Sequence, residues 1–139
     1  MSKAVIIYNS KTGITKKYAE EIAAYLNQKK ITVKVLPLKN GKNKMITEAD
    51  YLFLGCWTSG LFLFLQHPDK LWKDFASKLP ENLKQKTALF TTYKVATGSM
   101  FGNMRKELNG KIADCATELK SRKGKLSDSD KLIIDQFIG

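Results

Sequence analysis

A cluster of small hydroxyl side chains follows the first apolar run of the chain. The run ends at residue 9, and the next six residues read Ser-Lys-Thr-Gly-Ile-Thr, from Ser10 to Thr15. The glycine permits a tight turn that brings backbone N–H groups forward, and the helical pattern that follows adds the positive end of a helix dipole. Donors gathered around one point suit a phosphate. The loop is therefore a candidate anion site, with an ordinary strand-to-helix turn as the alternative.

Other residue types that carry chemistry give little support for a metal or nucleophilic site. The loop matches neither the Walker A pattern nor GxGxxG, so a triphosphate site and a dinucleotide site are both poorly supported. Cys56 and Cys115 stand far apart in strand-like segments, which favours buried, inert thiols. His67 has no nearby Cys or second His, so we expect a loop residue and no metal site. The sequence offers no obvious acid, base or nucleophile, and we name no catalytic residue.

Apolar periodicity predicts strands that alternate with helices along the whole chain. The polar stretch 39–50 leaves room for a helix of only a turn or two, and Pro37 suits an edge strand because proline cannot donate to a central ladder. A last helix begins after Ser127, which is placed to cap it in a near capping box with Asp130. The predicted strands are 3–9, 31–38, 51–58, 87–93 and 112–119, and the other predicted helices are 15–29, 69–79 and 99–110.

This alternation predicts one α/β domain over residues 1–139, with a parallel sheet covered by helices on both faces. In such folds a ligand binds beyond the carboxyl ends of the strands, where the strand order reverses. The loops after the first, third and fourth strands are therefore the places to look for a site.

The charge balance is the unusual feature of the composition. The chain carries 24 Lys and Arg against 13 Asp and Glu, a formal charge of +11, which favours acidic partners. The lysines are scattered and no RNP-type motif, zinc finger or evident helix-turn-helix accompanies them, so we expect a solvated basic surface and no nucleic-acid partner. No apolar run is long enough to span a bilayer, and a cytoplasmic location is the default expectation.

The first loop resembles the flavodoxin signature, in which a Ser/Thr-x-Thr-Gly-x-Thr loop after the first strand binds the phosphate of FMN. The resemblance extends to the length and element count of the short-chain members. It implies a three-layer flavodoxin-like sandwich whose five parallel strands lie in the order 2-1-3-4-5. The residues that would hold the phosphate are Ser10, Lys11, Thr12, Gly13, Ile14 and Thr15.

The resemblance also assigns the flavin ring to two later loops. In the family, the loops after the third and fourth strands enclose the isoalloxazine ring, often with an aromatic side chain. Trp57 and Tyr93 are the aromatic candidates, although a tryptophan at a strand end can equally be a core residue. The implied ring-binding residues are Trp57, Thr58, Ser59 and Gly60 from the first loop and Thr92, Tyr93, Lys94 and Gly98 from the second.

Two features depart from the family pattern. Low-potential carriers of the family are typically acidic near the flavin, whereas loops 55–60 and 91–99 contain no Asp or Glu and Lys94 adds a cation. Because a cation stabilises the negative charge of a reduced flavin, we expect a less negative potential than acidic loops give. The apolar run Leu61 to Leu65 either faces a ligand or a partner, or begins the third helix inside the core.

Three hypotheses follow for the function. The first is an FMN-binding electron carrier that works with redox partner proteins, for which the charge favours acidic surfaces. The second is an FMN-dependent oxidoreductase that acts on a quinone or another small organic substrate. The third is an interaction protein that kept the fold and lost the flavin, against which the intact phosphate loop argues.

Overall fold

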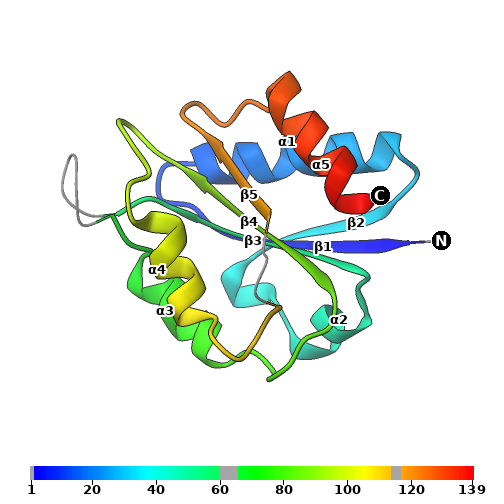
Figure 1. Cartoon of the computed structure of the whole chain (residues 1–139), viewed down its shortest axis with the longest axis horizontal. Helices are drawn as coiled ribbons and strands as arrows, with labels where there is room; N and C mark the ends of the chain where they lie inside the picture. Colours follow the sequence, from blue (N-terminus) through cyan, green and yellow to red (C-terminus); the bar gives the residue numbers. More distant parts are fainter. Residues whose placement is uncertain (1, 60–65, 114–116) are drawn as a thin grey trace.

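A five-stranded parallel sheet forms the centre of the molecule. The computed structural model describes residues 2–59, 66–113 and 117–139. The strands lie in the order β2-β1-β3-β4-β5, as Figure 1 shows, so the flavodoxin-like α/β fold is confirmed. Their bounds are β1 Lys3–Asn9, β2 Thr32–Pro37, β3 Tyr51–Trp57, β4 Lys86–Thr92 and β5 Thr117–Ser121.

Helices cover both faces of this sheet (Figure 1). One face carries α1 and α5, and the other carries α2, α3 and α4. The short 3₁₀ helix η1 and α2 account for the polar stretch in which we predicted at most a turn or two. The helices are α1 Ile14–Gln28, η1 Leu38–Asn40, α2 Asn43–Glu48, α3 Lys70–Ser77, α4 Met100–Glu107 and α5 Asp128–Ile138. None of the helices that the structure describes is long and apolar enough to cross a membrane.

The sheet separates two hydrophobic cores, because successive side chains of a strand point to opposite faces. Ile6 belongs to the core under α1 and α5, with Tyr18 and Ile134. Its neighbour Ile7 belongs to the core under α3 and α4, with Trp72. The continuous apolar runs of the central strands therefore contribute side chains to both cores, which is the pattern expected of strands buried on both faces.

The fifth strand extends further along the chain than the sequence predicts. We predicted a strand at 112–119, but β5 runs over Thr117–Ser121, and Leu119 is its one buried residue. Ile112, which suggested an earlier start, instead packs against the α3–α4 core as a half-buried side chain outside the sheet. An edge strand with a single buried residue leaves only a weak apolar pattern, so its bounds were misplaced.

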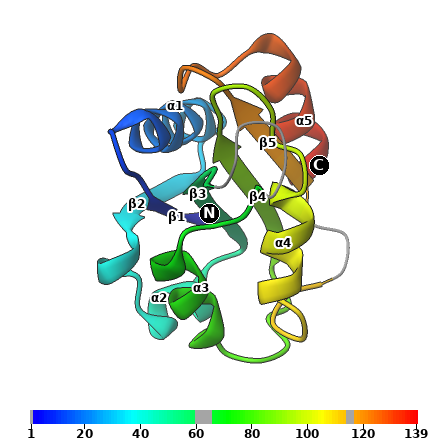
Figure 2. The ribbon, with the colours of Figure 1, turned by 90° about the vertical axis from the view of Figure 1, so that its left-hand side faces the viewer.

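The carboxyl ends of the strands gather at one edge of the molecule. Figure 2 looks onto this edge, where the loop before α1, the loop between β4 and α4 and the turn after β5 come together. Figure 1 places both termini toward the opposite end of the sheet. The edge onto which Figure 2 looks is the one where a doubly wound sheet binds its ligand. Gly60, Leu61 to Leu65 and Cys115 lie outside the described residues, and the predictions for them stay predictions.

Candidate functional site

A cavity of about 420 Å³ opens at the carboxyl edge of the sheet. The loops after β1, β3 and β4 form most of its wall, and the turn after β5 completes it. Ser10, Gly13 and Gly98, which we also predicted for the site, do not line the cavity in this structure. The lining residues are Lys11, Thr12, Ile14, Thr15, Trp57, Thr58, Ser59, Gln66, Thr92, Tyr93, Lys94, Val95, Ala96 and Arg122.

The loop before α1 has the geometry of an anion site. Gly13 adopts φ 94°, a left-handed conformation that strains other residues, and it is the N-cap of α1. The Ser10 hydroxyl oxygen accepts the N–H groups of Gly13 at 3.0 Å and Lys16 at 3.3 Å, which fixes the turn. No carboxylate occupies the first turn of α1 to neutralise the helix dipole. The exposed Thr12 side chain lines the cavity beside this turn.

Paired threonine hydroxyls connect the three loops beneath the cavity. Thr15 is buried, and its Oγ1 lies 2.6 Å from Oγ1 of Thr92. The hydroxyl of Thr58 lies 2.8 Å from the hydroxyl of Thr91. The Thr91 hydroxyl also donates to the Cys56 carbonyl at 2.6 Å. Since a hydroxyl has one proton, Thr15 can donate to a ligand only when Thr92 is the donor of their pair. Thr15 therefore ties the first loop to the third, whatever else it binds.

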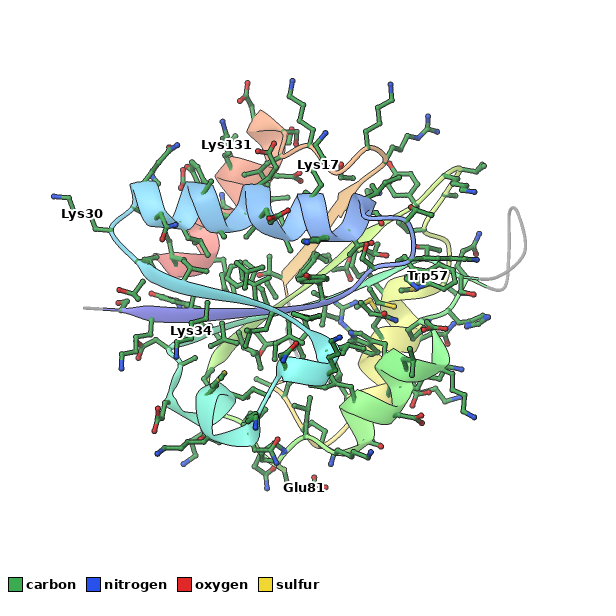
Figure 3. All side chains as sticks on the ribbon, turned by 180° about the vertical axis from the view of Figure 1, so that it is seen from behind. Lys17, Lys30, Lys34, Trp57, Glu81 and Lys131 are labelled. Atoms are coloured by element: carbon green, nitrogen blue, oxygen red, sulfur yellow. The ribbon has the colours of Figure 1, made fainter. Side chains whose placement is uncertain are left out.

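A positively charged side chain lies over each of two aromatic rings in the cavity wall. Nζ of Lys11 lies 4.8 Å from the centre of the Trp57 ring, and the Arg122 guanidinium lies 5.8 Å from that of Tyr93. Trp57 is half-buried, and it packs against the α3–α4 core while also lining the cavity. Figure 3 shows Trp57 at the carboxyl edge of the sheet.

The electrostatic character of the cavity is uniformly basic. Its described lining contains three cations and no carboxylate, since Lys94 joins the two cations that lie over the aromatic rings. At ordinary pH such a wall attracts anionic groups and favours negative charge on a bound molecule. The absence of acidic residues from the loops, noted in the sequence, thus extends to the whole described lining.

Gln66 lines the cavity with an unsatisfied side chain. It is 2% exposed, yet neither Nε2 nor Oε1 has a hydrogen-bond partner in the structure as described. Its backbone carbonyl is held, because it accepts Oγ of Ser99 at 2.8 Å and Nδ2 of Asn103 at 2.7 Å. Buried amides are rarely left without partners, so the Gln66 side chain is an exception among the described residues.

The sequence did not single out four of the lining residues. Val95 and Ala96 lie inside the loop 91–99 that we assigned to the ring, so their position was already implied. Arg122 directly follows β5, and we did not consider the loop after the fifth strand. For Gln66 we find no local pattern that could have indicated its role.

Cys56 and His67 stay outside the chemistry of the cavity. Burial raises the pKa of the Cys56 thiol to about 12, so the thiol stays protonated near neutral pH, and Cys56 is the inert buried residue we predicted. His67 lies between elements and pairs with Ser59 through an isolated antiparallel bridge. Within residues 2–59, 66–113 and 117–139, no group of three or more His, Cys, Asp or Glu residues could hold a metal ion.

Comparison with known proteins identifies relatives of this arrangement. A family model described as a flavodoxin domain matches residues 5–121. The fold is similar to flavodoxin 1 from Bacillus cereus, with a TM-score of 0.71 and 18% identity over 99% of this chain and 95% of that one. It is similar to Megasphaera elsdenii flavodoxin, with a TM-score of 0.72 and 19% identity over 98% and 99% of the two chains.

A third solved structure is a short-chain flavodoxin associated with a PDU bacterial microcompartment. Its TM-score is 0.76 at 15% identity, over 99% of this chain and 94% of that one. At these identities the structural matches show the fold, whereas the family model rests on the sequence. No curated protein matches the chain.

Proposed function

Because the chain belongs to the flavodoxin domain family, we propose that its cavity binds FMN non-covalently and that the protein is an electron carrier. The observation that carries this proposal is the composition of the cavity that the loops after β1, β3 and β4 form at the carboxyl edge. The cavity collects four of the six predicted phosphate-loop residues (Lys11, Thr12, Ile14 and Thr15) and both aromatic candidates from segments far apart in the sequence.

The residues present fit the parts of FMN. The turn fixed by Ser10, together with the exposed Thr12 hydroxyl and the start of α1, suits the phosphate. Trp57 and Tyr93 supply flat apolar surface for the ring. When bound, FMN supplies the electron-transfer chemistry, while the protein binds it, orients it and sets the charge around it.

The cations of the lining distinguish this site from that of an acidic carrier. Lys11, Lys94 and Arg122 place positive charge at the cavity with no carboxylate among the described lining residues to offset it. Positive charge favours the reduced, negatively charged ring. We therefore propose a less negative reduction potential than acidic-loop flavodoxins have. Spectroelectrochemical titration of the FMN-loaded protein tests this, and a potential as low as theirs would contradict it.

The phosphate assignment is tested by replacing Thr12 with Ala. Thr12 is exposed and outside the core, so the fold should be unaffected. Loss of one hydrogen bond to a charged group should weaken FMN binding on the order of tenfold, measured by quenching of flavin fluorescence. Riboflavin, which lacks the phosphate, should bind the variant as well as it binds the wild type. Thr47→Ala is the matched control, because Thr47 is an exposed residue of α2. It should change the affinity for neither FMN nor riboflavin.

The same titration separates the other hypotheses. Equal losses for FMN and riboflavin would show that the loop does not bind the phosphate. A wild-type protein that is colourless and fails to quench FMN fluorescence would favour the flavin-free interaction protein. If FMN binds, turnover of quinones with a nicotinamide donor would favour the FMN-dependent oxidoreductase over the carrier.

A further inference from the structure

Positive charge gathers beside the cavity, where the turn after β5 meets the first turn of α1. The turn carries three exposed cations within four residues, and α1 adds a fourth. Figure 3 shows Lys17 on the outer side of α1. We call this surface the basic platform, and its residues are Lys17, Arg122, Lys123 and Lys125.

We propose that the basic platform docks the acidic surface of a redox partner protein. The inference rests on the proposed electron carrier, and it assigns to that carrier a docking surface and a class of partner. It adds to the cavity a surface on two elements that the phosphate loop and the aromatic walls do not include.

The first argument is that the turn is built to lie against α1. A Cβ at Gly124 would lie 2.6 Å from the Ile14 carbonyl oxygen and 3.3 Å from Cβ of Lys17. Gly124 also has φ +79°, a left-handed conformation that strains other residues. Glycine therefore lets the turn approach the helix closely enough for the charges of both elements to form one surface.

Hydrogen bonds fix the turn in this position. The Ser121 hydroxyl accepts the N–H of Gly124 at 3.0 Å and donates to the Lys125 carbonyl at 3.1 Å. The Ser121 carbonyl accepts the N–H of Tyr93 at 3.2 Å, and Nη2 of Arg122 donates to the Val95 carbonyl at 3.4 Å. The turn is thus held between α1 and the loop after β4.

The second argument is that the platform keeps its charge. Among the described residues, none of its side chains forms a salt bridge with a carboxylate. Glu21 accepts the Leu126 N–H at 3.4 Å, and Asp128 lies 4.0 Å from Nζ of Lys131. Like charges held close together repel one another, and an acidic surface relieves that repulsion.

The third argument is continuity with the cavity. Arg122 belongs to the platform and also to the cavity lining, where its guanidinium lies over the Tyr93 ring. A partner docked on the platform would therefore lie beside the cavity opening, where a flavin carrier exchanges electrons. A nucleic acid is the competing polyanion, but the sequence shows none of the motifs that recognise one.

The experiment measures binding of an oxidised, acidic [2Fe–2S] ferredoxin by isothermal titration calorimetry, with and without FMN. At about 0.02 M salt the wild type should bind it with a Kd below about 100 μM. Raising the salt to about 0.5 M should weaken binding at least about tenfold, because the charges are exposed and screened.

Charge reversal locates the docking surface. The double variant Lys123→Glu, Lys125→Glu should weaken low-salt binding on the order of 10- to 100-fold, and Lys17→Glu should weaken it by about three- to tenfold. The matched control is Lys42→Glu, Lys44→Glu, which makes the same change in net charge at exposed positions of α2 and its N-cap. Because α2 covers the other face of the sheet, the control should lose less than about threefold.

Three outcomes would overturn the inference. Equal losses in the turn variant and the α2 control would show that net charge alone attracts the ferredoxin. No binding to the wild type at low salt would exclude the acidic partner. A DNA duplex of about 20 base pairs that binds more tightly than ferredoxin, and loses affinity in the same variants, would identify a nucleic-acid surface.

The titrations with and without FMN separate this inference from the proposed function. If FMN binds but the ferredoxin does not, the docking surface is wrong and the FMN site stands. If FMN does not bind but the ferredoxin binds through the platform, the proposed function fails and the platform stands as a docking surface for an acidic protein.

Discussion

At the scale of single residues, Gly98 matters because its missing side chain leaves space for Gln66, and not because it contacts the cavity itself. We predicted it as a ring-binding residue, yet it does not line the cavity; it has φ +48° and lies against the Gln66 amide. A side chain at this position would meet Oε1 of Gln66 at 2.1 Å and would also be strained by the left-handed backbone. Its effect on a ligand should therefore pass through Gln66.

Replacing Gly98 with Ala should displace the Gln66 amide. We expect flavin affinity to fall on the order of tenfold and stability to fall by about 1 kcal/mol, because the new methyl group clashes and the backbone is strained. Gly102→Ala is the matched control: this glycine lies in α4 with open space around it, so alanine should stabilise the helix by up to about 1 kcal/mol. Fluorescence titration and thermal melting measure both effects, and unchanged affinity in Gly98→Ala would contradict the link to Gln66.

The difference between predicted and observed site residues also lies at this scale. The lining threonines Thr12, Thr15 and Thr58 and the aromatic residues Trp57 and Tyr93 were predictable because they lie near the ends of strands that must reach the same edge. Gln66 was not, because its place in the cavity wall depends on three-dimensional packing. Arg122 was missed because it follows β5, and the loop after the fifth strand was not one of the loops we considered.

At the scale of elements, the predictions succeeded where apolar runs are long. The strands β1, β3 and β4 were predicted closely because the five middle residues of β1 and β3 are all buried, as are six of the seven in β4. The edge strand β5 has one buried residue and was misplaced. The predicted cap of α5 is confirmed, since Ser127 and Asp130 form a full capping box. Asp130 also accepts a hydrogen bond from Tyr18 of α1, which no local pattern could reveal.

The contact between α1 and α5 makes a prediction about acid stability. Asp135 of α5 accepts the Tyr25 hydroxyl at 2.7 Å and lies 3.1 Å from Nζ of Lys29. The hydrogen bond from Tyr25 and then that from Lys29 lower the pKa of Asp135. A lowered pKa in the folded state contributes stability above the unfolded pKa of about 3.9, and this contribution is lost as the pH falls through the folded pKa.

Asp135→Asn should therefore make unfolding less sensitive to acid. In urea unfolding at a series of pH values from about 6 to 2, the wild type should lose more stability than the variant in the acid part of the range. Tyr25→Phe, which removes the largest cause of the shift, should give an intermediate dependence. The exposure of the group keeps the effect small. Identical pH profiles for wild type and Asp135→Asn would show that this cluster does not link the helices.

At the scale of the whole molecule, the net charge of the chain and the charge of the cavity lining are both positive. The chain carries a formal charge of +11, and the cavity has three cations and no carboxylate in its described lining. Lys123 adds an exposed charge in the turn after β5, beside Arg122 and at the same edge. Basic charge also occurs far from the cavity: Figure 3 shows Lys30 at the end of the molecule opposite Trp57. An acidic redox partner would thus be attracted by the molecule as a whole, but held in a productive position only by charges near the cavity.

Charge reversal at the two ends separates these effects. With FMN bound, electron transfer from a reduced, acidic [2Fe–2S] ferredoxin to the flavin should slow as salt rises from about 0.02 to 0.5 M, whereas transfer from the flavin to basic cytochrome c should accelerate. Lys123→Glu should lower the low-salt rate with ferredoxin by about tenfold, because it reverses a charge beside the cavity without altering its lining. Lys30→Glu makes the same change in net charge at the opposite end and should lower that rate by less than about threefold. Equal effects of the two variants would mean that net charge alone guides the encounter, and a faster low-salt reaction with cytochrome c would rule out an acidic partner at this edge.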